Sequence, residues 1–515
     1  MRTMIRLCVL GMLLFVFTGT AGAIDLYDGK VVIHGKWSNQ MLMRAHGTKS
    51  YEEDYNIFNA RSSLKLEAMW HVYDGPDYSL NFYSVWKQFY DGAKNIDSSY
   101  KRQMQNGSNG GSAGYDQISH YSDFKDVSRE LFVEFNAPTF QLRLGKQIVS
   151  WGETSFERMV DNINPVDLRG SLNPAYPDFA EIKRGLWMAR LFFTPEDQPM
   201  DMSYELLIIP DFEPNRINPA GYHTAWNQGF ADLANNYPNG YPDQIFKAYY
   251  RDQPDDDLSK PEIGFRVRGF LSGWDWTLSY FHHRADDAVL KANQGGQIGS
   301  AAATGARLKK VYRYPWMDTF GFTVNKPVDV TIPIIPFTSL AMSGNIFRLE
   351  AIYEHDKPGV TSQGVGPTGP LSKITKQDRY AVVLGWDTKI FLPGITPWAR
   401  NKYLSSSSQL FYELMPDKSR NDLYYPWVTY APKKKSWWVY TQSFNYELWN
   451  GRILPGFYGA YYINEKGGYY APAIGFKPQF KHTFLVRYMN YFGLGASSSD
   501  LNSKDFWTFE YTYEF

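Results

Sequence analysis

Residues 507–515 read Trp507-Thr508-Phe509-Glu510-Tyr511-Thr512-Tyr513-Glu514-Phe515. Successive side chains of a β-strand point to opposite faces, so the five aromatic residues share one face and the Thr and Glu residues share the other. On a soluble protein, the aromatic face would be a large exposed apolar patch. In a membrane β-barrel, that face meets lipid and the polar face meets a water-filled lumen. The stretch therefore predicts a transmembrane β-strand.

Residues 1–23 have the pattern of a secretory signal peptide. Arg2 and Arg6 precede an apolar run over residues 7–17, and a small-residue cleavage site ends at Ala23. The apolar run has about 11 residues, too few to cross a ~30 Å hydrocarbon core as a helix. We expect cleavage after Ala23, which leaves residues 24–515 as one outer-membrane domain.

The composition excludes several kinds of chemistry. Cys8 is the only cysteine and lies in the predicted signal peptide, which excludes disulfides, thiol catalysis and cysteine-ligated cofactors in the mature chain. The 53 Lys and Arg residues balance 53 Asp and Glu residues, which gives no sign of a nucleic-acid partner. Aromatic residues make up 17% of the chain, as the girdles of a membrane barrel require. A secreted sugar-binding β protein is the alternative for this composition.

The body of the chain contains segments in which apolar and polar residues alternate with period two. For example, Ile263, Phe265 and Val267 are interleaved with Glu262, Arg266 and Arg268. Ten residues of a strand tilted by ~45° span roughly 23 Å, close to the ~25 Å apolar band of an outer-membrane barrel. We predict an all-β, transmembrane antiparallel β-barrel of about 16 strands, with an even number between about 14 and 18.

Connections of two lengths separate these segments. Short turns at residues 74–77, 136–139 and 450–451 are predicted to face the periplasm, because outer-membrane barrels have short periplasmic turns. Long connections at residues 92–126, 153–184, 211–260 and 326–343 are predicted to lie on the extracellular side. They either fold into the lumen and narrow it or cover the rim, and both alternatives remain open.

Residues 142–170 contain the most distinctive motif of the chain. Gly145-Lys146-Gln147 is followed by Ser150-Trp151-Gly152-Glu153 and then by Asn164-Pro165-Val166-Asp167-Leu168. This block resembles a bacterial outer-membrane β-barrel family of unknown function, and the strand ending in Gly-Lys-Gln is also similar to that of alginate-export-type porins. The resemblance implies a barrel over the whole chain and no established catalytic residue. It also implies, for some members, a role in uptake or export of hydrophobic compounds.

The same block supplies candidate residues for a constriction. Alternation ends at Gly145, where the chain can kink, and Arg143 is expected to point into the lumen because its neighbours face lipid. The charged residues that follow either anchor a loop or set selectivity at a narrowing of the lumen. The candidate lumen and constriction residues are Arg143, Lys146, Glu153, Glu157, Arg158, Asp161, Asp167 and Arg169.

We find no motif of a hydrolase, a P-loop or a dinucleotide-binding fold, so we expect no enzyme activity, cofactor or catalytic metal. The leading expectation is a porin-like channel for passive or loop-gated passage of small solutes. One alternative is a transporter of hydrophobic small molecules, because several aromatic residues occupy nominally inward positions. The other alternative is a structural sheath or platform for a partner protein. The inward aromatic residues are Tyr83, Phe89, Phe132, Phe270 and Phe281.

The expected location is the outer membrane of a Gram-negative bacterium. The expected partners are membrane lipid, an unidentified small-molecule solute and the barrel-assembly machinery. The last strand resembles the signal that this machinery reads. The candidate assembly-signal residues are Phe509, Tyr511, Tyr513 and Phe515.

Overall fold

The structure is a computed structural model. It describes residues 24–45, 57–97, 119–121, 123–154, 158–167, 179–198, 200–216, 249–251, 258–287, 289–292, 310–328, 331–333, 341–361, 373–392, 403–417, 422–423, 435–493 and 505–515. The predicted signal peptide, residues 1–23, lies outside the described residues.

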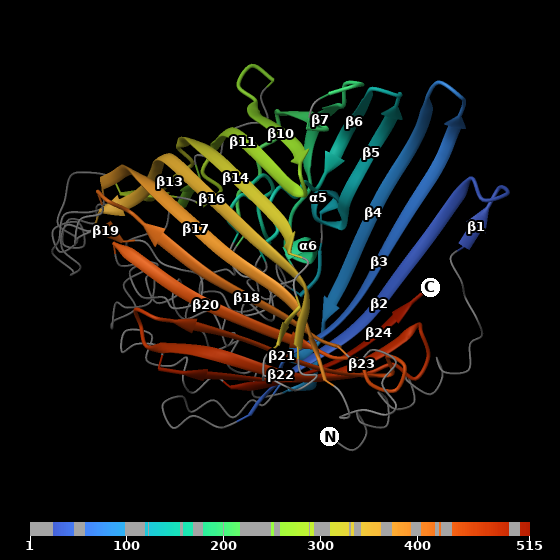
Figure 1. The fold of residues 1–515 in the computed structure, drawn as a ribbon, viewed down its shortest axis with the longest axis vertical. Helices are drawn as coiled ribbons and strands as arrows, with labels where there is room; N and C mark the ends of the chain where they lie inside the picture. Colours follow the sequence, from blue (N-terminus) through green and yellow to red (C-terminus); the bar gives the residue numbers. More distant parts are fainter. Residues whose placement is uncertain are drawn as a thin grey trace.

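Eighteen antiparallel strands form one closed barrel within the described residues. Each strand pairs with the next along the chain, and β2 (Val31–Arg44) closes the ring by pairing with β24 (Phe506–Glu514). Figure 1 shows the blue β2 beside the red β24 at this seam. The other barrel strands are β3 (Ile57–Asp74), β4 (Ser79–Asp91), β5 (Ser128–Asn136), β6 (Phe140–Gln147), β7 (Leu186–Phe193), β8 (Ser203–Ile209), β10 (Glu262–Leu271), β11 (Trp274–Arg284), β14 (Trp316–Val328), β16 (Ala341–Thr361), β17 (Lys373–Phe391), β18 (Tyr403–Leu414), β20 (Ser436–Asn445), β21 (Ile453–Tyr462), β22 (Gly467–Phe476) and β23 (His482–Phe492).

Shorter elements accompany the barrel. β1 (Ile24–Leu26) adds an extra strand along the start of β2. The remaining strands are β9 (Tyr249–Arg251), β12 (Val289–Ala292), β13 (Lys310–Arg313), β15 (Ile332–Pro333) and β19 (Asp422–Leu423). The described residues also form the one-turn helices α2 (Ala93–Ile96), α5 (Phe124–Val127) and α6 (Phe179–Ile182). No helix in the described parts of the chain has the length and hydropathy needed to cross a membrane.

The predicted all-β antiparallel barrel is confirmed, and its 18 strands lie at the upper end of the predicted range of 14–18, above the central value of about 16. Strands such as β8 and β22 explain the difference. The inward side of β8 carries Leu207 and Ile209, and that of β22 carries Tyr469 and Ala471, all four of them buried. Because both faces of these strands carry apolar residues, their hydropathy does not alternate and the sequence signal is weak.

The two faces of the wall differ as the alternation predicts. On β24, Trp507 and Phe509 are exposed on the outside, whereas Thr508 is buried on the inside. On the outer face of β11, β14, β16 and β17, the rings of Tyr280, Phe320, Tyr353 and Tyr380 form one row with centroids 4.9–5.9 Å apart. On the inner face of β16–β18, the guanidinium of Arg379 bridges Glu354 and Glu413, at 2.8 Å to each. Apolar side chains therefore point outward and many charged side chains point inward.

The three short turns lie where they were predicted. β3 ends at Asp74 and β4 begins at Ser79, β5 and β6 are joined across residues 137–139, and β20 and β21 are joined across residues 446–452. All three lie at the end of the barrel where β2 begins and β24 ends, because consecutive strands run in opposite directions. The long connection at residues 326–343 joins β14 to β16 at this same end, so the prediction that it lies opposite the short turns is wrong. That this end faces the periplasm remains a prediction.

Candidate lumen constriction

After β6 the chain leaves the wall and enters the barrel. Gly145, inside β6 and two residues before its end, has a φ of 135°, and a Cβ there would lie 2.3 Å from the carbonyl oxygen of Leu131. Only glycine tolerates that conformation and that contact. We call residues 148–154, 158–167 and 179–185, the described parts of the chain between β6 and β7, the inward segment.

Asn164 holds the two ends of the inward segment together. Its Oδ1 accepts a hydrogen bond from the Val149 backbone N–H at 2.6 Å. Its Nδ2 donates to the carbonyl oxygens of Gln147 at 3.0 Å and Arg184 at 2.8 Å. The side chain is fully buried, so its three bonds replace bonds to water that the backbone groups have lost.

A buried ion pair forms a second internal anchor. The Lys183 ammonium lies 2.5 Å from the Asp161 carboxylate, and Lys183 also donates to the carbonyl oxygen of Val149. Asp161 in turn accepts a hydrogen bond from the Trp151 backbone N–H at 3.2 Å. Buried charges are stable only when paired and hydrogen-bonded, and both conditions hold here.

Trp151 fixes the segment to one side of the wall. Its indole N–H donates to Glu205 of β8 at 3.1 Å, and its ring packs edge-on against Phe281 of β11. Two wall glycines make room for the contact. A Cβ on Gly264 would lie 2.9 Å from the Trp151 ring, and a Cβ on Gly321 would lie 2.9 Å from Val160.

The segment also reaches opposite sides of the ring. Glu153 accepts hydrogen bonds from Asn325 of β14, at 3.0 Å, and from Arg348 of β16. At the other side, Glu181 of α6 binds Lys87 of β4 and lies 3.5 Å from Lys65 of β3. Figure 1 shows α6 inside the ring of strands. The inward segment therefore spans the lumen between β3–β4 and β14–β16.

The charges around Glu181 favour its ionised form. Burial opposes ionisation, but Lys87, Arg129 and Lys65 outweigh it and hold the pKa of the Glu181 carboxyl below its ordinary value. Glu213, at the end of β8, behaves in the same way. Burial opposes its ionisation, and Arg184 lowers its pKa through an ion pair of 2.7 Å.

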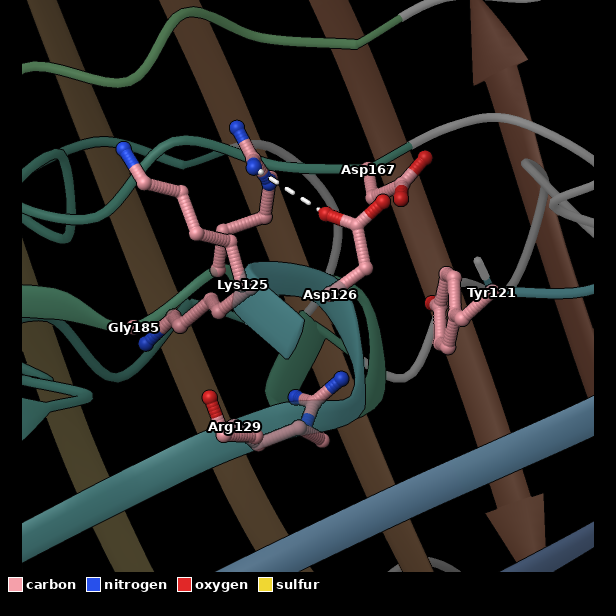
Figure 2. A pocket seen from close by; sticks show the side chains of 9 residues that line it. Tyr121, Lys125, Asp126, Arg129, Asp167 and Gly185 are labelled. Carbon is pink, nitrogen blue, oxygen red and sulfur yellow. Dashed lines mark hydrogen bonds and ion pairs between the residues drawn. The ribbon is translucent and has the colours of Figure 1, made fainter. Parts of the chain in front are cut away.

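A small pocket lies where the inward segment meets α5. Figure 2 shows Asp126 of α5 facing an arginine side chain across a dashed ion pair. Asp126 binds Arg184 at 3.2 Å and also binds Arg216, which follows β8. The pocket is lined by Tyr121, Lys125, Asp126, Ser128, Arg129, Asp167, Lys183, Arg184 and Gly185. Paired charges line this pocket and join α5, β5 and the inward segment.

The structure places some of the predicted site residues in the lumen and others against backbone carbonyl groups. Arg143 points into the lumen, where its Nε donates to Glu134 at 2.6 Å, and Glu153 spans to the wall. Lys146 is buried and donates to the carbonyl oxygens of Lys125 and Ser128. Arg158 donates to the carbonyl oxygen of Asp161. These contacts show where each side chain lies, and a role in selectivity remains a prediction.

The other predicted residues are also accounted for. Asp161 binds Lys183, as described above, and the backbone of Asp167 forms a bridge to Arg216. Glu157 and Arg169 lie outside the described residues. Of the aromatic residues predicted to face inward, Phe89, Phe132 and Phe281 are buried, whereas Phe270 is exposed near a turn. Tyr83 packs against Phe132 with ring centroids 5.1 Å apart.

The sequence reasoning did not single out Lys183, Glu350, Gly264 or Gly321. Glu350 of β16 accepts the Glu153 backbone N–H, and the two glycines contact the inward segment as described above. Lys183 belongs to the inward segment and pairs with Asp161 inside it. The glycines had a readable signal, because glycine in the interior of a strand often marks close approach of another segment. Among the described residues, no three His, Cys, Asp or Glu side chains are grouped so as to hold a metal ion.

Comparison with solved structures returns outer-membrane channels at low identity. "Salmonella typhi OmpF complex with Daunomycin" is 10% identical, with 96% of this chain and 100% of that chain covered and a TM-score of 0.40. Acinetobacter baumannii OccAB4 is 9% identical, with 96% and 98% covered and a TM-score of 0.47. Acinetobacter baumannii OccAB3 is 9% identical, with 94% and 99% covered and a TM-score of 0.46.

No curated protein matches the sequence. One family profile matches residues 44–515, which is nearly the whole chain and includes the Trp151-Gly152-Glu153 motif. The chain belongs to the family described as "Protein of unknown function (DUF1302)".

Proposed function

We propose that this protein is a porin-like channel of a Gram-negative outer membrane, through which small solutes pass passively or under control of the inward segment. One observation carries the proposal. The barrel wall is closed, with apolar residues outside and charged residues inside. The inward segment crosses the lumen and is bonded to opposite sides of this wall. Such a wall satisfies every backbone group without an edge, which is what a lipid bilayer requires.

The side chains near the constriction are suited to aqueous solutes. Glu153 is 46% exposed and Arg348 is 29% exposed, although the two form an ion pair. Arg268 of β10 is 59% exposed beside Asp275 of β11. Mixed charges that remain in contact with the lumen lower the cost of moving a hydrated, polar solute past the segment.

Planar-bilayer recording of the purified protein tests the proposal. We expect discrete conductance steps, because the described wall encloses a polar lumen. The control is the same preparation after boiling, which removes the heat-modifiable folded form and abolishes the steps. A folded preparation that stays electrically silent at many insertions overturns the proposal.

Transport of hydrophobic small molecules is a second candidate, favoured by one region of the lumen. Buried inward side chains of β20–β23 are aromatic or aliphatic there, namely Trp437, Val439, Tyr462, Tyr469 and Tyr491. Uptake of a fluorescent naphthylamine into protein-containing vesicles, faster than into empty vesicles, supports this candidate. The sheath hypothesis is disfavoured, because the inward segment occupies the space that a partner protein inside the lumen needs.

A further inference from the structure

The inner wall of β5–β10 carries an unusual pair of like charges. Arg143 of β6 and Arg190 of β7 are direct cross-strand neighbours, and both point into the lumen. Like charges directly opposite each other destabilise a sheet. Both guanidinium groups also lie over the same ring, that of Phe192, at 5.8 Å and 4.4 Å from its centroid. The arrangement therefore concentrates positive charge beside an aromatic face.

The carboxylates on this wall are shared among the arginines. Glu134 binds Arg143 through Nε at 2.6 Å, and Glu205 binds Arg190 through Nε at 2.7 Å. Glu205 is shared, because it also binds Arg266 at 2.6 Å and accepts the Trp151 indole N–H. Three arginines thus share two directly bonded glutamates, and Glu130 of β5 also lies near Arg143.

The terminal guanidinium nitrogens of Arg143 and Arg190 remain available. Within the part of the chain that the structure describes, each of these two arginines uses only its Nε in a hydrogen bond. The Arg143 side chain is 28% exposed and the Arg190 side chain is 10% exposed, so Arg143 offers most of the accessible surface. A guanidinium presents its N–H groups as a planar fork, and the preferred partner of that fork is a carboxylate bound through both oxygens.

Aromatic rings flank this fork. Arg143 lies 5.3 Å from the centroid of Phe132, and Tyr83 packs against the same ring at 5.1 Å. Arg266 lies 5.5 Å from the ring of Trp151, which belongs to the inward segment. Rings and guanidinium planes alternate along the wall, and each offers a flat face on which a planar organic group can stack.

We propose that this stripe, formed by Arg143, Arg190, Phe132 and Phe192, is a binding site for aromatic carboxylates on their way through the lumen. The carboxylate lies between the two guanidinium groups and relieves their repulsion, and the ring of the solute stacks on Phe192 or Phe132. The proposal rests on the proposed channel function, whose substrate class it names.

Binding and conduction are measured separately, with benzoate as the probe. Saturation-transfer NMR on the detergent-solubilised protein gives the Kd, and planar bilayers show whether benzoate interrupts the current. We expect benzoate to bind more tightly than cyclohexanecarboxylate, whose ring is not aromatic, and than benzyl alcohol, which lacks the charge. Equal signals from benzoate and benzyl alcohol overturn the proposal.

Substitutions then locate the site. Arg143→Gln and Arg190→Gln are each expected to weaken benzoate binding about tenfold, the effect of losing a hydrogen bond between charged groups. Arg268→Gln is the matched control, because Arg268 is an inward arginine outside the stripe that pairs with Asp275. Heat-modifiable migration of every variant confirms folding. Unchanged benzoate affinity in both folded stripe variants overturns the proposal.

The outcomes also separate this proposal from the proposed function. If the protein conducts ions but does not bind benzoate, the proposed binding site is wrong and the proposed channel function stands. If the folded protein gives no current but binds benzoate, and Arg143→Gln weakens that binding as expected, the proposed channel function is wrong and the proposed binding site stands.

Discussion

Two regions of the molecule are held in different ways: the seam where β24 meets β2 and the inward segment. At the seam, each side chain is positioned by its cross-strand neighbours. Trp37 meets Tyr511 edge-to-face outside the barrel, and Gln40 donates to Glu510 inside it. In the inward segment, a few buried polar groups bond residues that are far apart in the sequence, as Asn164 does.

The difference predicts different sensitivities to substitution. The seam depends on which face a residue occupies, so many residues of the right polarity serve equally well. The inward segment depends on individual donors and acceptors, and removal of one leaves its buried partners unsatisfied. The predictions below test this contrast, from the largest expected effect to the smallest.

Charges on the outer face of the seam are expected to have the largest effect. Tyr511→Asp combined with Tyr513→Asp places two carboxylates on the lipid-facing side of β24, and charged groups there destabilise a membrane barrel. We expect loss of folded barrel from the membrane fraction, measured by heat-modifiable migration. Deletion of Phe515, whose backbone pairs with Gly35, is expected to impair assembly too.

Thr512→Asp is the matched control for the seam. Thr512 lies between the two tyrosines on the same strand but on the lumen side, where it is buried beside Glu510, so a carboxylate there does not face lipid. This variant is expected to assemble. If the double tyrosine variant yields normal amounts of folded barrel, assembly does not depend on an apolar outer face at the seam.

Asn164→Ala is expected to release the inward segment and leave the wall intact. The substitution leaves the Val149 N–H and two carbonyl groups without partners, at a cost of about 1–3 kcal/mol for each buried group. We expect noisy or increased conductance and trypsin cleavage between β6 and β7, with normal heat-modifiable migration. Asn95→Ala, at an exposed asparagine that bonds Tyr90, is the control. Quiet, native-sized conductance in Asn164→Ala refutes the role of this residue.

Gly264→Ala is expected to have a smaller effect by crowding Trp151 off the wall. The added Cβ lies 2.9 Å from the ring, and such overpacking costs about 1–3 kcal/mol. Gly456→Ala is the matched control, since this inward wall glycine has only a contact of 3.3 Å. Single-channel recording of both variants is the measurement. Identical open-channel noise in the two variants would mean that the position of Trp151 against the wall does not depend on the space at Gly264.

These contrasts also show what the sequence is able to reveal. The outer and inner faces of β24 follow from period two, because a local rule of strand geometry applies at every residue. The bonds of Asn164 are invisible to that rule, since they join positions up to 20 residues apart through a single side chain. The glycines at 264 and 321 mark where the segment packs, but only the closed ring shows which part of the chain they accommodate.

Acidification is expected to loosen the contact between α6 and β4. The pKa of Glu181 is lowered in the folded protein, so the stability that its ionised form contributes is fully present above the ordinary pKa of 4.5. It is lost progressively as the pH falls from that value toward the lower pKa of the folded state. We expect conductance fluctuations to rise when recordings move from pH 7 to below that pH. Glu181→Gln removes the titrating group and is expected to fluctuate equally at both values. A pH response that Glu181→Gln retains in full assigns the effect to another group.

Glu153→Gln is expected to have the smallest effect on stability and a measurable effect on selectivity. Its ion pair with Arg348 is partly exposed, and such pairs contribute roughly 0–1 kcal/mol. Removal of the charge frees Arg348 for passing anions, although Asp387 still lies 2.7 Å from its Nε. We therefore expect the reversal potential in a salt gradient to shift toward anions, with unchanged heat-modifiable migration. Arg348→Gln provides the opposite test, because loss of the cation is expected to shift the potential toward cations. Equal potentials in the two variants would place the selectivity of the lumen away from the tip of the inward segment.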